Sequence, residues 1–358
     1  MGFFSKKVDK NFLGIDIGLS GIKLVELVND GKGHPRLVTY AYINRPLDTF
    51  DELFTTKVDE TATIIKEMMK KARTTTKIVV SALPVSSVIN LIINVVANND
   101  KELQEAILWQ AKKVIPMPLE EVQLDWKVLD RDVTTKSKKN VSQVLLTGAP
   151  KTLVSQYVDL LNKRVGLNLI SLETETLAQV RSLIGNDRST IMVIDIGYSR
   201  TNIVVVDRGI PSLNRSIAFG GKNMTEIMSK LLSIDLKQAE TIKKDMSNIN
   251  ALTPDMDLNI VLETLMKQII SEVKYSFSLY QNQADVGERR QIDKIIVTGG
   301  SAMLFGLDNY LTKVMNVNTY VGDPWARVVY PLDLDSILKE IGARFSVAIG
   351  CAMRDINT

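Results

Sequence analysis

The sequence predicts an α/β fold of two lobes that face each other across a cleft. Three observations lead to this expectation: a glycine-containing hairpin near the start of the chain, a second copy about half a chain later, and a strand that runs into a Gly-Gly turn. They occupy residues 13–28, 191–207 and 295–307. A chain of 358 residues is too long for one small core, which agrees with two lobes or several subdomains.

The first hairpin reads L-G-I-D-I-G-L-S-G-I-K, and apolar runs on both sides of its turn predict two adjacent strands. Gly18 and Gly21 remove side chains where a ligand can approach the backbone. Backbone N–H groups, the Ser20 hydroxyl and the Lys23 ammonium are donors that suit a phosphate chain. Asp16, at the strand end, can hold Mg²⁺ through water, because this ion keeps much of its hydration.

The second hairpin reads I-M-V-I-D-I-G-Y-S-R-T-N-I-V-V-V-D and repeats the pattern. Asp195, Gly197, Ser199 and Thr201 take the places of the acid, the glycine, the serine and the turn. A single D-x-G-x-S motif is equally typical of an ordinary hairpin turn. Two copies between apolar strands favour two hairpins that grip one phosphate chain from both sides.

The third stretch, I-I-V-T-G-G-S-A-M-L-F-G-L, predicts a strand, a turn and the start of a helix. Thr298, Gly299 and Gly300 let the backbone pass close to a flat ligand. The helix is expected to begin at Ser301, where its N-terminus favours negative charge.

Together these stretches resemble the actin-like ATPase superfamily, with its two phosphate hairpins and its adenosine loop. The resemblance implies two ribonuclease-H-like lobes that bind ATP and Mg²⁺, with Asp16 and Asp195 on the metal side. The opening I-D-I-G-L-S-G-I-K-L-V-E-L, the G-G-S-A-x-x-x-G-L loop, D-P-W at 323–325 and S-V-A-I-G-C-A-M-R at 346–354 are similar to the PilM family. Its members are cytoplasmic actin-like proteins of type IV pilus assembly, and FtsA is the nearest relative in style.

The chain in order fits this resemblance. A strand-helix-strand-loop-strand unit follows Pro84, with a helix over 101–115 that Pro116 and Pro118 end and a polar loop over 134–140. Its length and position are similar to the subdomain called 1C in FtsA. The implied division is first lobe (1A) 1–84, 1C-like insertion 85–142, return of 1A 143–190, second lobe (2A) 191–221, cap (2B) 222–290, 2A again 291–340, and a C-terminal helix 341–358 that returns to the first lobe.

Two further sites follow from the resemblance. Glu240 and Lys243, one helical turn apart, fit the pair that reaches the ribose and base in actin-like proteins, and a surface ion pair is the alternative. Glu175 aligns with the glutamate that positions the attacking water in MreB. The alternative is that Glu173 and Glu175 only cap a helix start, where the helix dipole favours acids.

Composition narrows the classes of function. A net charge of +3 argues against nucleic acid as the main partner. The single cysteine, Cys351, excludes an internal disulfide and fits a reducing cytoplasm. With one cysteine and one histidine, His34, in the whole sequence, a zinc site is not expected.

The resemblance therefore predicts an ATP-binding assembly protein at the inner face of the cell membrane. Its partner would be a PilN-like bitopic membrane protein, whose N-terminal peptide binds beside the insertion, together with other pilus platform and motor proteins. The membrane is reached only through the partner. A filament former like FtsA or MreB, and a small-molecule kinase of the same superfamily, are the alternatives. Hydrolysis is expected to be slow or absent, because only Glu175 could position water.

Overall fold

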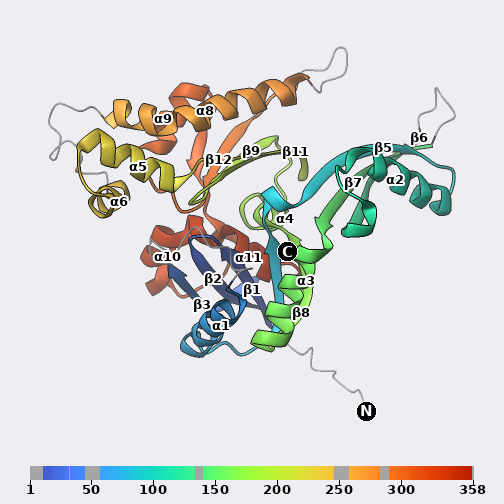
Figure 1. The fold of residues 1–358 in the computed structure, drawn as a ribbon, viewed down its shortest axis with the longest axis horizontal. Coiled ribbons are helices and arrows are strands. Elements are labelled where there is room, and N and C mark those ends of the chain that lie inside the picture. Colours follow the sequence, from blue (N-terminus) through green and yellow to red (C-terminus); the bar gives the residue numbers. More distant parts are fainter. Residues whose placement is uncertain are drawn as a thin grey trace.

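Two five-stranded sheets and one three-stranded sheet organise the chain, as seen in a computed structural model (Figure 1). The structure describes residues 11–31, 33–44, 57–133, 140–245, 258–282 and 290–356. The predicted polar loop over 134–140, apart from its last residue, lies outside these ranges.

The first sheet has the strand order β3-β2-β1-β4-β8. Its strands are β1 (Asn11–Gly18), β2 (Gly21–Asn29), β3 (Pro35–Asn44), β4 (Ile78–Leu83) and β8 (Asn168–Thr174). The first three pair antiparallel, while β4 lies parallel to β1 and β8 parallel to β4. Every inner residue of β1 is buried, because helices cover both faces of this sheet.

The second sheet repeats this order as β11-β10-β9-β12-β13. Its strands are β9 (Ile191–Ile196), β10 (Thr201–Asp207), β11 (Ile210–Ile217), β12 (Lys294–Thr298) and β13 (Thr319–Val321). Again the first three are antiparallel and the last two parallel. The two lobes are therefore built alike, as the repeated hairpins predict.

Helices cover both sides of the first sheet. On one side lie α1 (Val58–Ala72), α3 (Lys151–Val158) and the π-helical turn η4 (Asp159–Val165). On the other side lie η7 (Pro324–Arg327), η8 (Leu332–Leu334), α10 (Asp335–Ile341), η9 (Gly342–Phe345) and α11 (Ser346–Ala352). Figure 1 shows these C-terminal helices in red beside the blue first strands, so the chain end returns to the first lobe as expected.

The second sheet packs against the longest helix, α8 (Leu258–Asn282), which buries an apolar stripe from Val261 to Tyr280. Among the described residues this lobe also contains the helices α5 (Gly221–Leu232), α6 (Leu236–Lys244) and α9 (Leu307–Met315). Met224 and Met228 of α5 complete the same core.

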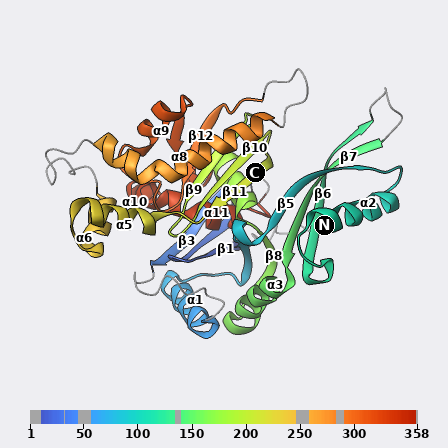
Figure 2. The same cartoon turned by 45° about the horizontal axis from the view of Figure 1, so that its top comes forward.

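The inserted unit forms its own sheet, in the order β5-β7-β6. It comprises η2 (Val85–Ser87), β5 (Ile89–Val96), α2 (Asp100–Val114), η3 (Leu119–Glu121), β6 (Val122–Val133) and β7 (Asn140–Pro150). Asn99 caps α2 by accepting from the Glu102 N–H at 2.9 Å. β7 pairs along its whole length, so this sheet reaches Pro150, past the expected end of the insertion at 142. Figure 2 shows the unit extending away from α8 and α9.

Two short helical segments cross between the lobes. α4 (Glu175–Gln179) continues into the π-helical turn η5 (Val180–Ile184) and packs against α11. The contact is backbone to backbone, because a Cβ on Gly350 would overlap the Ala178 carbonyl oxygen. Gly14 of β1 permits an equally close approach of α11 to the first sheet, because a Cβ on Gly14 would overlap the Ala348 carbonyl oxygen. α4 therefore has a fixed position from which its side chains can reach the second lobe.

Candidate functional site

The first hairpin carries an acid and a base side by side. β1 and β2 meet at a turn of two residues, and their register places Asp16 directly opposite Lys23. The Lys23 ammonium donates to Asp16 Oδ2 at 3.0 Å, and both side chains are largely buried. Ser20 lies in the turn and is partly exposed.

The glycines at the two ends of this turn differ in how much space surrounds them. Gly21 has a φ of 155°, and a Cβ there would overlap the Ile43 carbonyl oxygen of β3. A Cβ on Gly18 would lie 3.3 Å from the Lys23 Nζ atom. The bare backbone at Gly18 thus leaves room beside the ammonium, as a phosphate group needs.

The second hairpin has the same acid without the base. Asp195 lies directly opposite Asn202, whose amide oxygen accepts from the Ser216 hydroxyl at 2.8 Å. Gly197 and Ser199 lie in the turn and are partly exposed. The Gly197 carbonyl accepts from the N–H of Gly221 at 2.9 Å, which attaches the start of α5 to this turn.

Thr201 is a correction to the predicted set of ligand-binding residues. Its side chain is fully buried, and its hydroxyl donates to the Phe219 carbonyl at 2.7 Å. Residues of a strand alternate between faces, so the first residue of β10 turns into the core of the second lobe. Thr201 fixes the hairpin and offers no hydroxyl to a ligand.

The Gly-Gly turn lies beside the second aspartate. Thr298 Oγ1 and the Gly299 N–H donate to the Ala343 carbonyl at 2.9 Å and 3.1 Å. Gly299 has a φ of 89°, and a Cβ there would overlap Asp195 Oδ1. Nothing lies within 4 Å of where a Cβ on Gly300 would be, so this residue faces open space, as a flat ligand requires.

The expectation that a helix begins at Ser301 is wrong. Residues 301–306 form successive turns, and α9 begins only at Leu307, after Gly306 in the left-handed conformation. Ser301 instead donates its N–H to the Ile196 carbonyl at 3.1 Å, and a Cβ on Gly221 would lie 2.5 Å from its hydroxyl. Ser301 therefore contacts the second hairpin and α5 and presents no helix terminus to an anion.

Glu240 and Lys243 form an ion pair that is largely buried, and not the surface pair considered from sequence. The distance from Lys243 Nζ to Glu240 Oε2 is 2.6 Å. Lys243 also donates to the Gly221 carbonyl at 2.9 Å and to Thr225 Oγ1 at 2.7 Å. An ammonium has three hydrogens, and all three are used within the protein. Lys243 thus holds α6 on α5. Within the described ranges, the contact of Glu240 Oε1 is with Lys244 Nζ at 3.5 Å.

Glu175, the first residue of α4, accepts from the Val85 N–H at 3.0 Å. Burial, followed by the nearby charges of Asp16 and Asp195, raises the pKa of this carboxyl to about 8. Burial likewise raises the pKa of Asp195, although the hydrogen bond from Gln179 opposes it. Three carboxyl groups from two lobes therefore lie close enough to repel one another.

The repulsion between these carboxyl groups indicates that the site fits Mg²⁺. A divalent cation between Asp16 and Asp195 would relieve it, and carboxylate oxygens are ligands that Mg²⁺ prefers. Within the described residues, no group of three or more His, Cys, Asp or Glu side chains is arranged to hold a metal ion directly. The donor set therefore fits a hydrated ion that also binds phosphate oxygens, and not a cage of protein ligands.

Gln179 is a site residue that the sequence analysis missed. It lies one turn after Glu175 on α4, is 2% exposed, and donates to Asp195 Oδ2 at 2.7 Å. The spacing of these two residues, which places them on one helix face, is the signal that could have found it.

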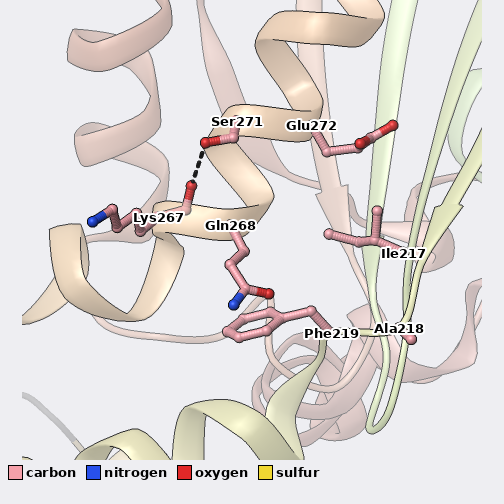
Figure 3. Close-up of a pocket in the computed structure, with 7 residues that line it drawn as sticks. All are labelled: Ile217, Ala218, Phe219, Lys267, Gln268, Ser271 and Glu272. Carbon is pink, nitrogen blue, oxygen red and sulfur yellow. Dashed lines mark hydrogen bonds between the residues drawn. The ribbon is translucent and has the colours of Figure 1, made fainter.

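A separate hollow lies elsewhere on the second lobe. It has a volume of about 560 Å³ and lies between the end of β11 and α8. Figure 3 shows the residues that line it: Ile217, Ala218, Phe219, Lys267, Gln268, Ser271 and Glu272. None of the predicted site residues lines it. In the part of the chain that the structure describes, no helix is long and apolar enough to cross a membrane.

Comparison with known proteins agrees with this geometry. A family model described as type IV pilus assembly protein PilM matches residues 14–356. A chain of the solved PilM-PilN type IV pilus biogenesis complex is 27% identical, with a TM-score of 0.80, and the match covers 97% of this chain and 98% of that one. The ethanolamine utilization protein EutJ from Carboxydothermus hydrogenoformans is 16% identical, with a TM-score of 0.54, over 96% of this chain and 89% of its own, and shares the fold.

The cell division protein FtsA of Bacillus subtilis (strain 168) is 25% identical over 268 residues. That match covers 64% of this chain and 58% of FtsA, so the chain spans less than two thirds of this relative.

Proposed function

The chain belongs to the PilM family of type IV pilus assembly proteins, with the actin-like ATPase fold, and from this premise we propose that it is a nucleotide-binding assembly protein acting at the cytoplasmic face of the cell membrane. Its partner is a PilN-like bitopic membrane protein, whose N-terminal cytoplasmic peptide it binds. Other pilus platform and motor proteins join the same assembly. The protein reaches the membrane through these partners.

The observation that carries this proposal is the likeness to the PilM-PilN complex along almost the whole chain. The three-stranded sheet supports a place for the peptide. β5 and β6 are its outer strands, and in the part of the chain that the structure describes each pairs with β7 and with no strand on its other side. An extended peptide can bind such an edge through backbone hydrogen bonds. We therefore place the peptide between the inserted unit and the first lobe.

Peptide binding is tested with the N-terminal cytoplasmic segment of a PilN-like protein. Titration of the labelled peptide should saturate, and hydrogen exchange should show protection of amides in β5 or β6. Replacing residues 85–150 with a short Gly-Ser linker should remove peptide binding and leave ATP binding intact. Protection confined to α5, α6 or α8 would instead place the peptide on the second lobe and refute this part of the proposal.

The nucleotide is ATP with Mg²⁺, bound between the two hairpins. Bound Mg²⁺ would neutralise part of the phosphate charge. Asp16 and Asp195 would hold its water shell. The Lys23 ammonium would contact phosphate oxygens in addition to Asp16. The turn residues Ser20 and Ser199 offer hydroxyl donors. Glu240 would accept from the ribose.

Adenine would lie over the open backbone at Gly300, where nothing occupies the space of a Cβ. Gly300→Val should weaken ATP binding strongly and leave inorganic triphosphate binding nearly unchanged, because only the base meets the added side chain. Calorimetry measures both affinities in the same variant, and triphosphate binding serves as the control for intact folding of the site. Unchanged ATP binding in this variant would make the turn purely structural.

Hydrolysis is proposed to be slow or absent. Glu175 is the candidate for orienting water, and its raised pKa keeps a large fraction of the carboxyl protonated near neutral pH. A protonated carboxyl is a poor acceptor for the proton of an attacking water. Phosphate release measured over hours, with Glu175→Ala as the reference, tests this directly.

Filament formation is the second candidate function, and the match to FtsA is the observation that favours it. A filament needs two different surfaces that meet head to tail. Sedimentation of the protein with and without Mg-ATP distinguishes a filament former from an assembly protein that does not polymerise. ATP-dependent pelleting would support the filament.

A further inference from the structure

One hydrogen bond joins the helix between the lobes to the second hairpin. Gln179 is the last residue of α4, which follows directly on β8 of the first sheet, while Asp195 belongs to β9 of the second sheet. The amide Nε2 of Gln179 donates to Asp195 Oδ2 at 2.7 Å, and the Gln179 side chain is almost completely buried. The bond therefore connects the two lobes at the residue proposed to face the metal ion.

Asp195 is enclosed from its other side as well. The backbone of Gly299 lies so close to Oδ1 that no Cβ fits between them. The carboxylate is thus held at Oδ2 by an amide and bounded at Oδ1 by backbone. Few side-chain rotamers satisfy both contacts.

The nature of the donor matters as much as its position. Asp16 is held by the ammonium of Lys23, which cancels much of its charge. No salt bridge to Asp195 occurs among the described residues, and its partner across the hairpin is the neutral Asn202. A neutral amide orients a carboxylate and leaves its full negative charge for a cation.

α4 is firmly placed for this task. Ala178 packs backbone to backbone against Gly350 of α11, and Thr176 Oγ1 lies 3.2 Å from Asn214 Oδ1 of β11. A change in the angle between the lobes would move Gln179 relative to Asp195, because the two residues sit on opposite sides of that junction.

We propose that Gln179 is a positioning residue for the metal side of the nucleotide site, which fixes the Asp195 carboxylate for hydrated Mg²⁺ and makes that fit depend on the placement of α4. This inference rests on the proposed nucleotide site. It assigns the second hairpin a dependence on lobe angle that the first hairpin lacks, since the Asp16–Lys23 pair lies within one hairpin.

The test uses Gln179→Met, which keeps the volume and removes the donor. ATP affinity is measured by calorimetry over a series of Mg²⁺ concentrations and in EDTA. The Mg²⁺ concentration needed for half of the affinity gain should rise about fivefold or more, the equivalent of one lost hydrogen bond. ATP affinity in EDTA should stay within about twofold, because the phosphate donors are untouched.

Ser182→Ala is the matched control. Ser182 is fully buried three residues further on, and its hydroxyl lies 2.7 Å from the Ser346 carbonyl oxygen and 3.4 Å from the backbone carbonyl oxygen of Gln179, without touching Asp195 or the Gln179 side-chain amide. Its loss should leave the Mg²⁺ dependence unchanged. Equal shifts in both variants, or an equal loss for Gln179→Met with and without Mg²⁺, would overturn the positioning role.

A second measurement needs no nucleotide. Gln179→Met and Asp195→Ala should lower the melting temperature less than additively when combined, because both remove the same contact. Additive shifts would refute the coupling. If the unaltered chain bound no ATP at any Mg²⁺ concentration, the proposed nucleotide function would fail, whereas normal ATP binding with an unaltered Mg²⁺ dependence in Gln179→Met would sink only the positioning role.

Discussion

The two hairpins carry the same D-x-G-x-S motif but are supported in different ways. In the first, the partner of Asp16 comes from the neighbouring strand, directly across the turn. In the second, the partner of Asp195 comes from α4, and the Gly-Gly turn after β12 bounds its other side. The turn of the second hairpin is attached to the start of α5 by the hydrogen bond from the Gly221 N–H to the Gly197 carbonyl. One hairpin is complete in itself, while the other is assembled from segments far apart in the sequence.

This difference indicates which hairpin would change its geometry if the angle between the lobes changed. A self-contained hairpin moves as a unit, so its geometry persists when the lobes rotate. A hairpin that depends on α4 and on the turn after β12 changes when either one moves. The second hairpin is therefore the part of the site whose metal affinity should follow conformation.

The largest expected effect comes from removing each aspartate. Asp16→Ala and Asp195→Ala should each weaken Mg-ATP binding about tenfold or more, because each acid holds part of the hydrated ion. In EDTA the two should diverge: Asp16→Ala frees Lys23 for phosphate and should bind ATP better than Asp195→Ala does. Calorimetry with and without Mg²⁺ measures both quantities.

Asp207→Ala, at the far end of β10, is a control for loss of an acid from the same lobe. It should change neither affinity. If Asp16→Ala and Asp195→Ala bound ATP equally well in EDTA, the proposed contrast between the hairpins would be wrong. Unchanged Mg-ATP affinity in either variant would remove the nucleotide-site assignment.

The next largest expected difference is in thermal stability, between alanine variants of the glycines that lie beside the two aspartates. Gly299→Ala places a Cβ against Asp195 Oδ1 and forces a residue with φ of 89° into a strained conformation. That strain alone costs about 1–2 kcal/mol. Gly18→Ala meets the end of the flexible Lys23 side chain at 3.3 Å and the Gly21 carbonyl oxygen at 3.4 Å, which is ordinary contact. Thermal unfolding should show a clear loss for Gly299→Ala and near-normal stability for Gly18→Ala; equal melting temperatures would contradict the comparison.

Much of this architecture follows from the sequence. The apolar runs around both D-x-G-x-S motifs predict the paired strands of each lobe, and the resemblance predicts the fold that the family match confirms. β11 was not expected, because I-P-S-L-N-R-S-I mixes polar residues with a proline. The strand forms nonetheless, since Pro211 sits at a register shift where its missing N–H is tolerated.

The site was harder to predict, because its contacts are tertiary. The helix expected at Ser301 is delayed to Leu307 by turns that end in Gly306, which a G-G-S-A pattern does not reveal. Lys243 matches a ligand-binding pattern, yet its three hydrogens are used within the protein. The roles of the individual site residues stay predictions until ligand binding is measured.

The acid between the hairpins offers a pH test. The pKa of Glu175 is raised to about 8 from 4.5, so the folded state binds the proton more tightly. Stability should therefore fall as pH rises through this interval, by at most about 2 kcal/mol between pH 6 and pH 8. Glu175→Gln should remove that slope in thermal unfolding of the ligand-free protein.

The same measurement distinguishes the two aspartates. After burial, the charge of Asp16 is the larger influence on the Glu175 pKa, and that of Asp195 follows. Asp16→Asn should therefore reduce the pH slope more than Asp195→Asn, and it also frees Lys23 to stabilise the Glu175 carboxylate. A slope that persists in Glu175→Gln would show that another group is responsible.

The smallest expected effect comes from giving the second hairpin the base of the first. Asn202 faces Asp195 across the hairpin as Lys23 faces Asp16, so the two pairs occupy equivalent positions. Asn202→Lys should place an ammonium beside Asp195, compete with Mg²⁺ there, and reduce the gain in ATP affinity on adding Mg²⁺ about twofold, as a partly exposed ion pair does. Asn202→Met controls for the lost hydrogen bond from Ser216. If the lysine and methionine variants responded alike to Mg²⁺, charge at this position would not be what separates the hairpins, and the contrast would then rest on α4 alone.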